Sequence, residues 1–103
     1  MKTYEIPWSV GAMFICNKCG IAFNEPENAE KLKLDLRTYL KENDQNKKIR
    51  VMVSGCLNVC KKEEQAISFQ PVLGSTKMFT VDQNYNSALI ELKSILDKKI
   101  ANE

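Results

Sequence analysis

Four cysteines stand in two tight pairs, and they carry most of the chemistry that this chain can offer. Two residues separate Cys16 from Cys19, three separate Cys56 from Cys60, and 36 lie between the pairs. Paired thiols that a fold brings together form a four-thiolate pocket, which suits zinc or an iron–sulfur cluster. All four cysteines are therefore candidate ligands for a metal or a cofactor.

The absence of histidine narrows the chemistry further. A chain without histidine has no His-containing zinc site, no Rieske-type cluster and no His general base. We therefore expect no hydrolase chemistry of the usual triad type. The 15 basic and 13 acidic residues leave a net charge of +2, which does not argue for nucleic acid as a partner. At 103 residues the chain is expected to form one domain with a modest core.

Neither a targeting segment nor a membrane span is expected. Residues 1–8 include a charge at Glu5 and a proline at Pro7, and they lack the apolar stretch of a signal peptide. The longest apolar run, Ala12 to Cys16, is too short to span a bilayer. We expect a cytoplasmic protein, in which paired cysteines bind metal or do redox work more often than they form disulfides.

Hydrophobic patterning predicts the elements that must position the thiols. The apolar run 12–15 ends at Cys16 and indicates a strand buried on both faces. A second strand is predicted over 49–53, which runs through Ser54 and Gly55 into Cys56. Between the two strands a helix is predicted from residues 25–26 onward, with these apolar residues on one face: Ala29, Leu32, Leu36, Tyr39 and Leu40. In a β-α-β unit the carboxyl ends of the two strands lie at one edge of a parallel sheet, so the two cysteine pairs could meet there.

The rest of the chain reads as a hairpin followed by a helix. Residues 66–70 and 76–80 look like two shorter strands, and the final helix is predicted over 82–99 with Asp82 as its cap. Its buried stripe is Tyr85, Ala88, Leu89, Leu92, Ile95, Leu96 and Ile100. We therefore expect a single small α/β domain in the order β-α-β-β-β-α, a sheet with helices packed on it, with residues 1–10 as an irregular extension.

Two other uses of the thiols stay open at this point. A zinc-binding module needs only a tetrahedron of sulfurs, although zinc ribbons usually separate their pairs by about 15–20 residues. A dithiol–disulfide oxidoreductase could use Cys16 and Cys19 as its C-x-x-C pair. Against that reading, the predicted helix starts several residues after Cys19, and the second pair would have no role.

The segment 51–60 closely resembles the signature of thioredoxin-like [2Fe-2S] ferredoxins, in which a strand leads into Gly-Cys-x-x-x-Cys. Residues 14–20 resemble the first ligand segment of that family, and the likeness covers roughly residues 12–100, with only the cysteine segments specific. The resemblance implies a thioredoxin-like fold and a [2Fe-2S] cluster. Cys16 and Cys19 would bind one iron of the cluster, and Cys56 and Cys60 would bind the other.

What the resemblance implies about function is electron transfer rather than enzyme activity. The chain would exchange single electrons with a redox partner protein, and the family likeness also suggests a homodimer. All-thiolate ligation implies a potential on the order of −400 mV, as in plant-type clusters. Lys18, Lys61 and Lys62 lie beside the ligands in the sequence and could offset the cluster's negative charge or steer an acidic partner.

Overall fold

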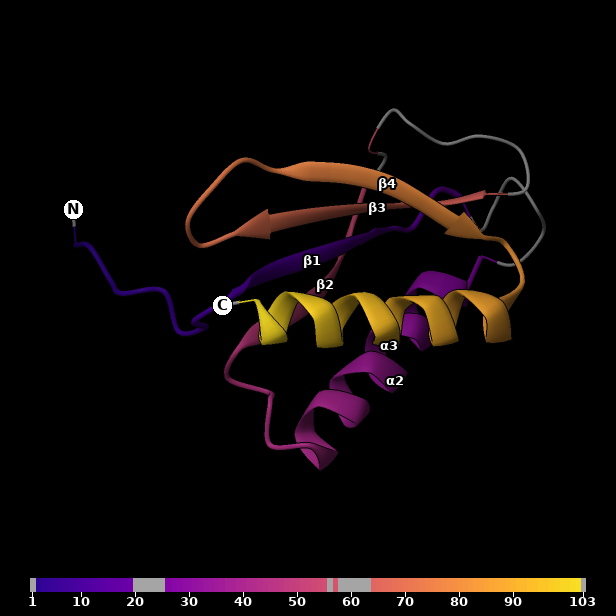
Figure 1. Ribbon diagram of the computed structural model, residues 1–103. Helices are drawn as coiled ribbons and strands as arrows, with labels where there is room; N and C mark the ends of the chain where they lie inside the picture. Colours follow the sequence, from indigo (N-terminus) through magenta and orange to yellow (C-terminus); the bar gives the residue numbers. More distant parts are fainter. Residues whose placement is uncertain (1, 20–25, 56, 58–63, 103) are drawn as a thin grey trace.

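In the computed structural model of the chain, the two helices formed by the described residues pack against one face of a four-stranded mixed sheet (Figure 1). The structure describes residues 2–19, 26–55, 57 and 64–102. Its described elements are β1 (Gly11–Cys16), α2 (Asn28–Glu42), β2 (Ile49–Ser54), β3 (Glu64–Pro71), β4 (Lys77–Asp82) and α3 (Tyr85–Ala101). The expectation of a small α/β fold, with helices packed on a sheet, is confirmed at this level.

The sheet has the strand order β2-β1-β3-β4. β1 and β2 are parallel, with Gly11 opposite Ile49 at one end and Cys16 opposite Ser54 at the other. β3 is antiparallel to both of its neighbours, β1 and β4. The parallel pairing expected for the first two strands is therefore present, and their carboxyl ends are level with each other.

The core lies between the sheet and the two helices. Alternate strand residues, such as Met13 and Ile15 of β1, point into it because successive side chains of a strand face opposite sides of the sheet. The apolar helix faces predicted from the sequence supply the other half of the core. The buried members of those faces are Ala29, Leu32, Leu36, Leu40, Ala88, Leu92 and Leu96.

The helix starts differ from the sequence-based expectation. α2 begins at Asn28, and Pro26 and Glu27 form a turn ahead of it. The prediction that Asp82 caps the last helix is wrong. β4 extends through Asp82, and the residue with extended backbone directly before α3 is Asn84, whose Oδ1 accepts a hydrogen bond from the Ser87 N–H at 3.0 Å.

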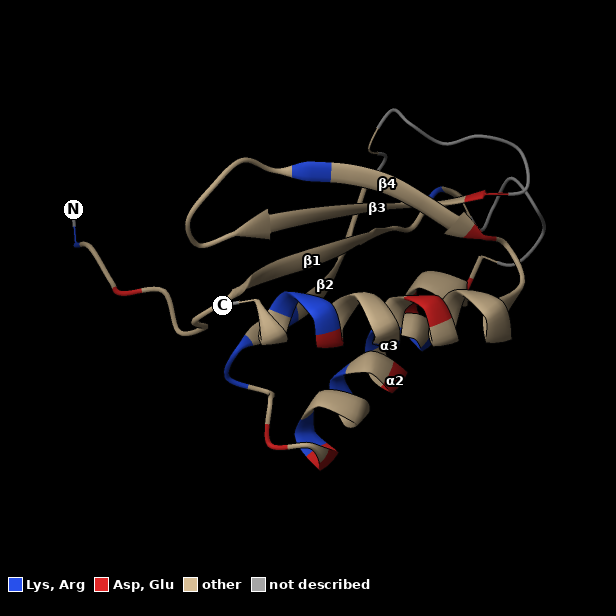
Figure 2. Cartoon of the chain, viewed as in Figure 1, with Lys and Arg blue, Asp and Glu red and all other residues tan. Residues whose placement is uncertain are grey.

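Charged side chains of both signs are interspersed along the two helices (Figure 2). The strands next to the first cysteine pair carry few charges: β1 has none, and β3 has only Glu64, at its first residue. β3 also starts two residues earlier than predicted and so includes Gln65. A polar side chain is thereby placed inside a strand that the sequence pattern assigned to apolar packing.

Candidate thiol site

The parallel pairing of β1 and β2 places the end of the strand that leads into the second cysteine pair beside Cys16. Cys16 ends β1 directly opposite Ser54, the last residue of β2. The Asn17 N–H donates to the Ser54 carbonyl oxygen at 3.0 Å, so the two strands stay joined one residue beyond the sheet. Cys56 follows Ser54 by two residues in the sequence. The chain that leads into the second pair therefore starts beside the first pair.

Both cysteines of the first pair are buried. Cys16 is 0% exposed and Cys19 is 1% exposed, and with Ala66 they form a small cluster separate from the main core. Asn17 and Lys18 form a turn between them, and Cys19 itself has helical backbone. The side chain of Leu57 packs against this cluster. Because Leu57 comes directly after Cys56, the second cysteine segment contributes a side chain to the surroundings of the first pair.

Two consecutive residues of β3 contact the first cysteine pair, one at each cysteine. The Ala66 N–H donates a hydrogen bond to the Sγ of Cys19 at 3.4 Å. The Nε2 of Gln65 donates to the Cys16 carbonyl oxygen at 2.7 Å and to the Ala66 carbonyl oxygen at 3.2 Å. Backbone N–H groups that point at sulfur stabilise metal-bound thiolates and tune the sites that these thiolates form. The surroundings of Cys19 thus suit a thiolate ligand.

Buried oxygens without hydrogen-bond partners gather around this site. In the described part of the chain three such side-chain atoms occur, and two of them are Asn17 Oδ1 and Gln65 Oε1. Asn17 lies inside the first pair, and Gln65 is bonded to the Cys16 main chain. A buried polar atom left without a partner costs about 1–3 kcal/mol. Each of these atoms calls for a partner, such as an ordered water or a bound group.

Four other residues predicted for the site lie outside the described residues. They are Cys56, Cys60, Lys61 and Lys62. Among the residues that the structure describes, no group of three or more His, Cys, Asp and Glu side chains could hold a metal ion, and this part of the chain holds two of the four cysteines. Lys18 is described, and its side chain is exposed to solvent.

Sequence reasoning missed three residues of the site: Leu57, Gln65 and Ala66. Leu57 stands between two predicted ligands and looks like a spacer, while Ala66 acts through its backbone, which carries no sequence signal. Gln65 had one possible signal, since it is an uncharged polar residue at the entry to an apolar strand. Its role depends on how β1 and β3 pair, because Gln65 and Cys16 are 49 positions apart in the sequence.

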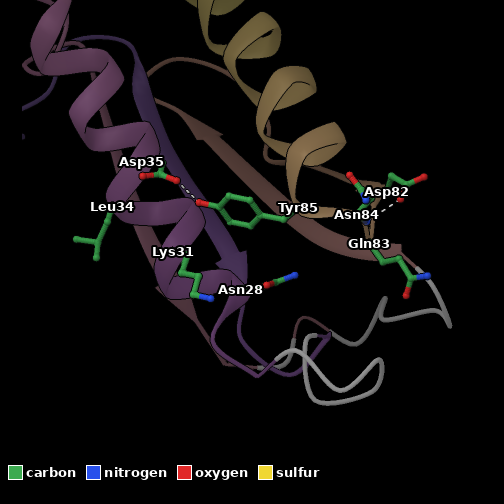
Figure 3. A pocket seen from close by; sticks show the side chains of 8 residues that line it. All are labelled: Asn28, Lys31, Leu34, Asp35, Asp82, Gln83, Asn84 and Tyr85. Carbon is green, nitrogen blue, oxygen red and sulfur yellow. Dashed lines mark hydrogen bonds between the residues drawn. The ribbon is translucent and has the colours of Figure 1, made fainter.

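A pocket of about 770 Å³ lies between the first turns of α2 and the connection from β4 to α3 (Figure 3). Its lining residues are Asn28, Lys31, Leu34, Asp35, Asp82, Gln83, Asn84 and Tyr85. The Tyr85 hydroxyl donates to the Asp35 carboxylate, and Asp82 accepts the Asn84 N–H at 2.7 Å. Burial and then the bond to Asp35 raise the pKa of Tyr85 well above its usual value of 10. Both acids of the pocket therefore bind groups of the fold itself.

Comparisons with known proteins provide no relative from which a function could be inferred. A scan against protein-family models, a search of curated proteins and a search of solved structures each find no match to the chain. Within the described residues, no helix combines the length and the apolar character needed to cross a membrane.

Proposed function

We propose that the chain is an electron-transfer protein that carries one [2Fe-2S] cluster on Cys16, Cys19, Cys56 and Cys60. The observation that carries the proposal is the packing of Leu57 against the buried cluster of the first cysteine pair. A residue from inside the second pair thus lies against the first pair, although 36 residues separate the pairs in the sequence. This is the arrangement that a shared four-thiolate site requires.

The donor set fits an iron–sulfur cluster. Cysteine thiolates are the soft ligands that such clusters require, and the Ala66 N–H at 3.4 Å from the Cys19 Sγ supplies a donor to a ligand sulfur. When bound, the cluster supplies a one-electron couple. The chain would hold it by Cys16 and Cys19 on one iron and by Cys56 and Cys60 on the other. Burial of the first pair would keep water away from the sulfurs.

The same burial counts against a disulfide-exchange function for the first pair. A thiolate must reach a disulfide sulfur to attack it, so catalytic thiols are partly exposed. Cys16 and Cys19 are 0% and 1% exposed. The burial of these two cysteines therefore favours a role as metal ligands over a role in disulfide exchange.

The sheet supports a thioredoxin-like domain as the scaffold for this function. It starts with a β-α-β unit whose strands β1 and β2 are parallel, and it continues with the antiparallel pair β3 and β4. The first cysteine pair begins at the last residue of β1, and the second follows β2 in the sequence, so the sheet edge at these carboxyl ends offers a common position for all four thiols.

Serine substitutions of the four cysteines test the proposal. Under oxygen-free expression with added iron, each of Cys16→Ser, Cys19→Ser, Cys56→Ser and Cys60→Ser should lose most of the visible absorbance and the dithionite-induced paramagnetic signal of the unaltered chain. Ser54→Ala is the control, because Ser54 lies opposite Cys16 and carries no sulfur. Full absorbance in a serine variant of either pair would remove that pair from the site. A colourless unaltered chain with one zinc would leave only a zinc-stabilised module.

A further inference from the structure

Gln65 is a fully buried amide in contact with the main chain of the first thiol, and we propose that it is a positioning residue of the thiol site. Its side chain is 1% exposed. Its Nε2 lies 2.7 Å from the carbonyl oxygen of Cys16, across the pairing of β1 with β3. The test by iron release rests on the proposed function. The test by cysteine alkylation uses the metal-free chain and does not depend on that function.

The orientation of the Gln65 amide is fixed by its two acceptors. Nε2 donates to the carbonyl oxygens of Cys16 and Ala66, at 2.7 and 3.2 Å. A reversed amide would place its oxygen against two other oxygens, neither of which can donate a proton. The position therefore needs an N–H donor, and a glutamate of the same shape would not serve.

One amide group thereby connects both thiol residues. Through Nε2 it holds the Cys16 carbonyl, and through the same atom it holds the carbonyl of Ala66. The N–H of Ala66 in turn donates to the Sγ of Cys19 at 3.4 Å. Gln65 thus fixes the end of β1 relative to the N–H that contacts the second sulfur.

Packing alone does not explain a glutamine at this place. Its Oε1 is buried and has no hydrogen-bond partner within the part of the chain that the structure describes. A methionine of similar length would fill the space without leaving an oxygen unpaired. The Nε2 group supplies two buried hydrogen bonds, so a purely structural role predicts a loss of stability without the amide. A positioning role predicts in addition that the amide changes the reactivity of the thiols.

The experiment compares Gln65→Met and Gln65→Glu with Gln70→Met and Gln70→Glu. Gln70 is the matched control because it lies on the same strand, is exposed and makes no contact with the cysteines among the bonds of the described residues. Its Nε2 donates to the neighbouring Pro71 carbonyl oxygen at 3.1 Å, and its Oε1 accepts from the Thr76 hydroxyl. In the reduced, metal-free chain, alkylation by iodoacetamide is followed at each cysteine by peptide mass spectrometry. Both Gln65 variants should react about tenfold faster at Cys16 and Cys19, the scale on which lost outer contacts weaken thiolate sites.

Stability and iron release are measured on the same variants. The thermal midpoint of metal-free Gln65→Met should lie below that of Gln70→Met, because two buried hydrogen bonds are lost, so alkylation is compared well below both midpoints. Iron-loaded Gln65→Met should release its iron to a chelator about tenfold faster. Alkylation and release rates equal to those of the Gln70 variants would overturn the positioning role and leave the cluster in place. A chain that binds no iron would remove the proposed function, while the alkylation comparison would still test Gln65.

A measurement on the unaltered chain covers the case in which the Gln65 variants do not fold. The side-chain amide protons of Gln65 should exchange with deuterated solvent far more slowly than those of Gln70, because only the former are buried against two carbonyl oxygens. Equal exchange rates for the two side chains would overturn the inference.

Discussion

The backbone N–H of Ala66 lies 3.4 Å from the Sγ of Cys19 and joins β3 to the first cysteine pair. β3 is an inner strand of the sheet, held by β1 on one side and β4 on the other. The donor is therefore part of a rigid element and not of a loop. A thiolate at Cys19 would meet this N–H without rearrangement of the strand, which is what a preorganised metal site requires.

Leu57→Ala should loosen the site without unfolding the domain. Leu57 is partly buried against the cluster that contains Cys16, so its truncation removes a contact between the two cysteine segments. We expect iron release to a chelator to become several-fold faster, on the scale of lost outer contacts at metal sites. Leu73→Ala is the control, because Leu73 is 90% exposed. Equal release from the two variants would contradict a shared site.

Gly11→Ala should destabilise the fold strongly. A Cβ built at Gly11 would lie 2.6 Å from the Gln70 carbonyl oxygen and 2.7 Å from the Phe69 ring. Crowding of this kind typically costs about 1–3 kcal/mol in the free energy of unfolding. Gly55→Ala is the matched control, because its Cβ would meet no described atom within 4 Å, and it should change stability by less than about 0.5 kcal/mol. Urea unfolding measures both, and similar midpoints would refute the close contact of β1 with β3.

Stability should fall as the pH rises above 10, and Tyr85 should account for part of the fall. Burial, followed by the bond to Asp35, raises the pKa of Tyr85 in the folded state above its usual value of 10. The folded state therefore holds the phenolic proton more tightly than the unfolded state does. The resulting stability is complete below pH 10 and is lost as the pH rises toward the folded-state pKa.

Urea unfolding at pH 8 and at pH 11 checks this dependence on Tyr85. Tyr85→Phe should lower the stability at pH 8 and flatten its fall between the two pH values. Tyr4→Phe serves as the control, because Tyr4 is 80% exposed. If both variants keep the pH dependence of the unaltered chain, the contact between Tyr85 and Asp35 does not contribute to it.

Lys18 should influence electron exchange with charged reagents. Its side chain is exposed and stands next to Cys19 in the sequence. For the reduced, iron-loaded protein, Lys18→Glu should slow oxidation by ferricyanide, an anion, by about two- to fivefold at low salt. The difference should shrink at high salt, where the screening length falls to about 3 Å at 1 M. Lys2→Glu gives the same change in net charge at another exposed position, and an equal effect from it would exclude local steering.

The periodic elements of the fold could be predicted because their patterns are strong and local. In the run before Cys16, Ala12, Met13 and Ile15 are buried as expected, whereas Phe14 is half-buried. The stripe from Ala88 to Leu96 faces the core. The helix cap at Asp82 could not be predicted correctly, since both Asp82 and Asn84 are good capping residues. The choice between them depends on where β4 ends, and pairing with β3 sets that end, with Glu64 opposite Asp82.

The candidate site could be predicted only as far as its cysteines. The spacing of Cys16 and Cys19 marks them as a pair, and the structure buries both. The contacts that surround them come from Gln65 and Ala66, and these depend on the register between β1 and β3. No local pattern encodes that register, because it is set by strand pairing across the intervening helix α2 and strand β2.

The most direct test of the central claim is the content of iron and acid-labile sulfide in the chain after oxygen-free expression with added iron. A [2Fe-2S] cluster on Cys16, Cys19, Cys56 and Cys60 predicts about two irons and two sulfides per chain, with a red-brown colour that dithionite bleaches. One zinc per chain, with no sulfide and no colour, would contradict the electron-transfer function and leave a zinc-stabilised domain in its place.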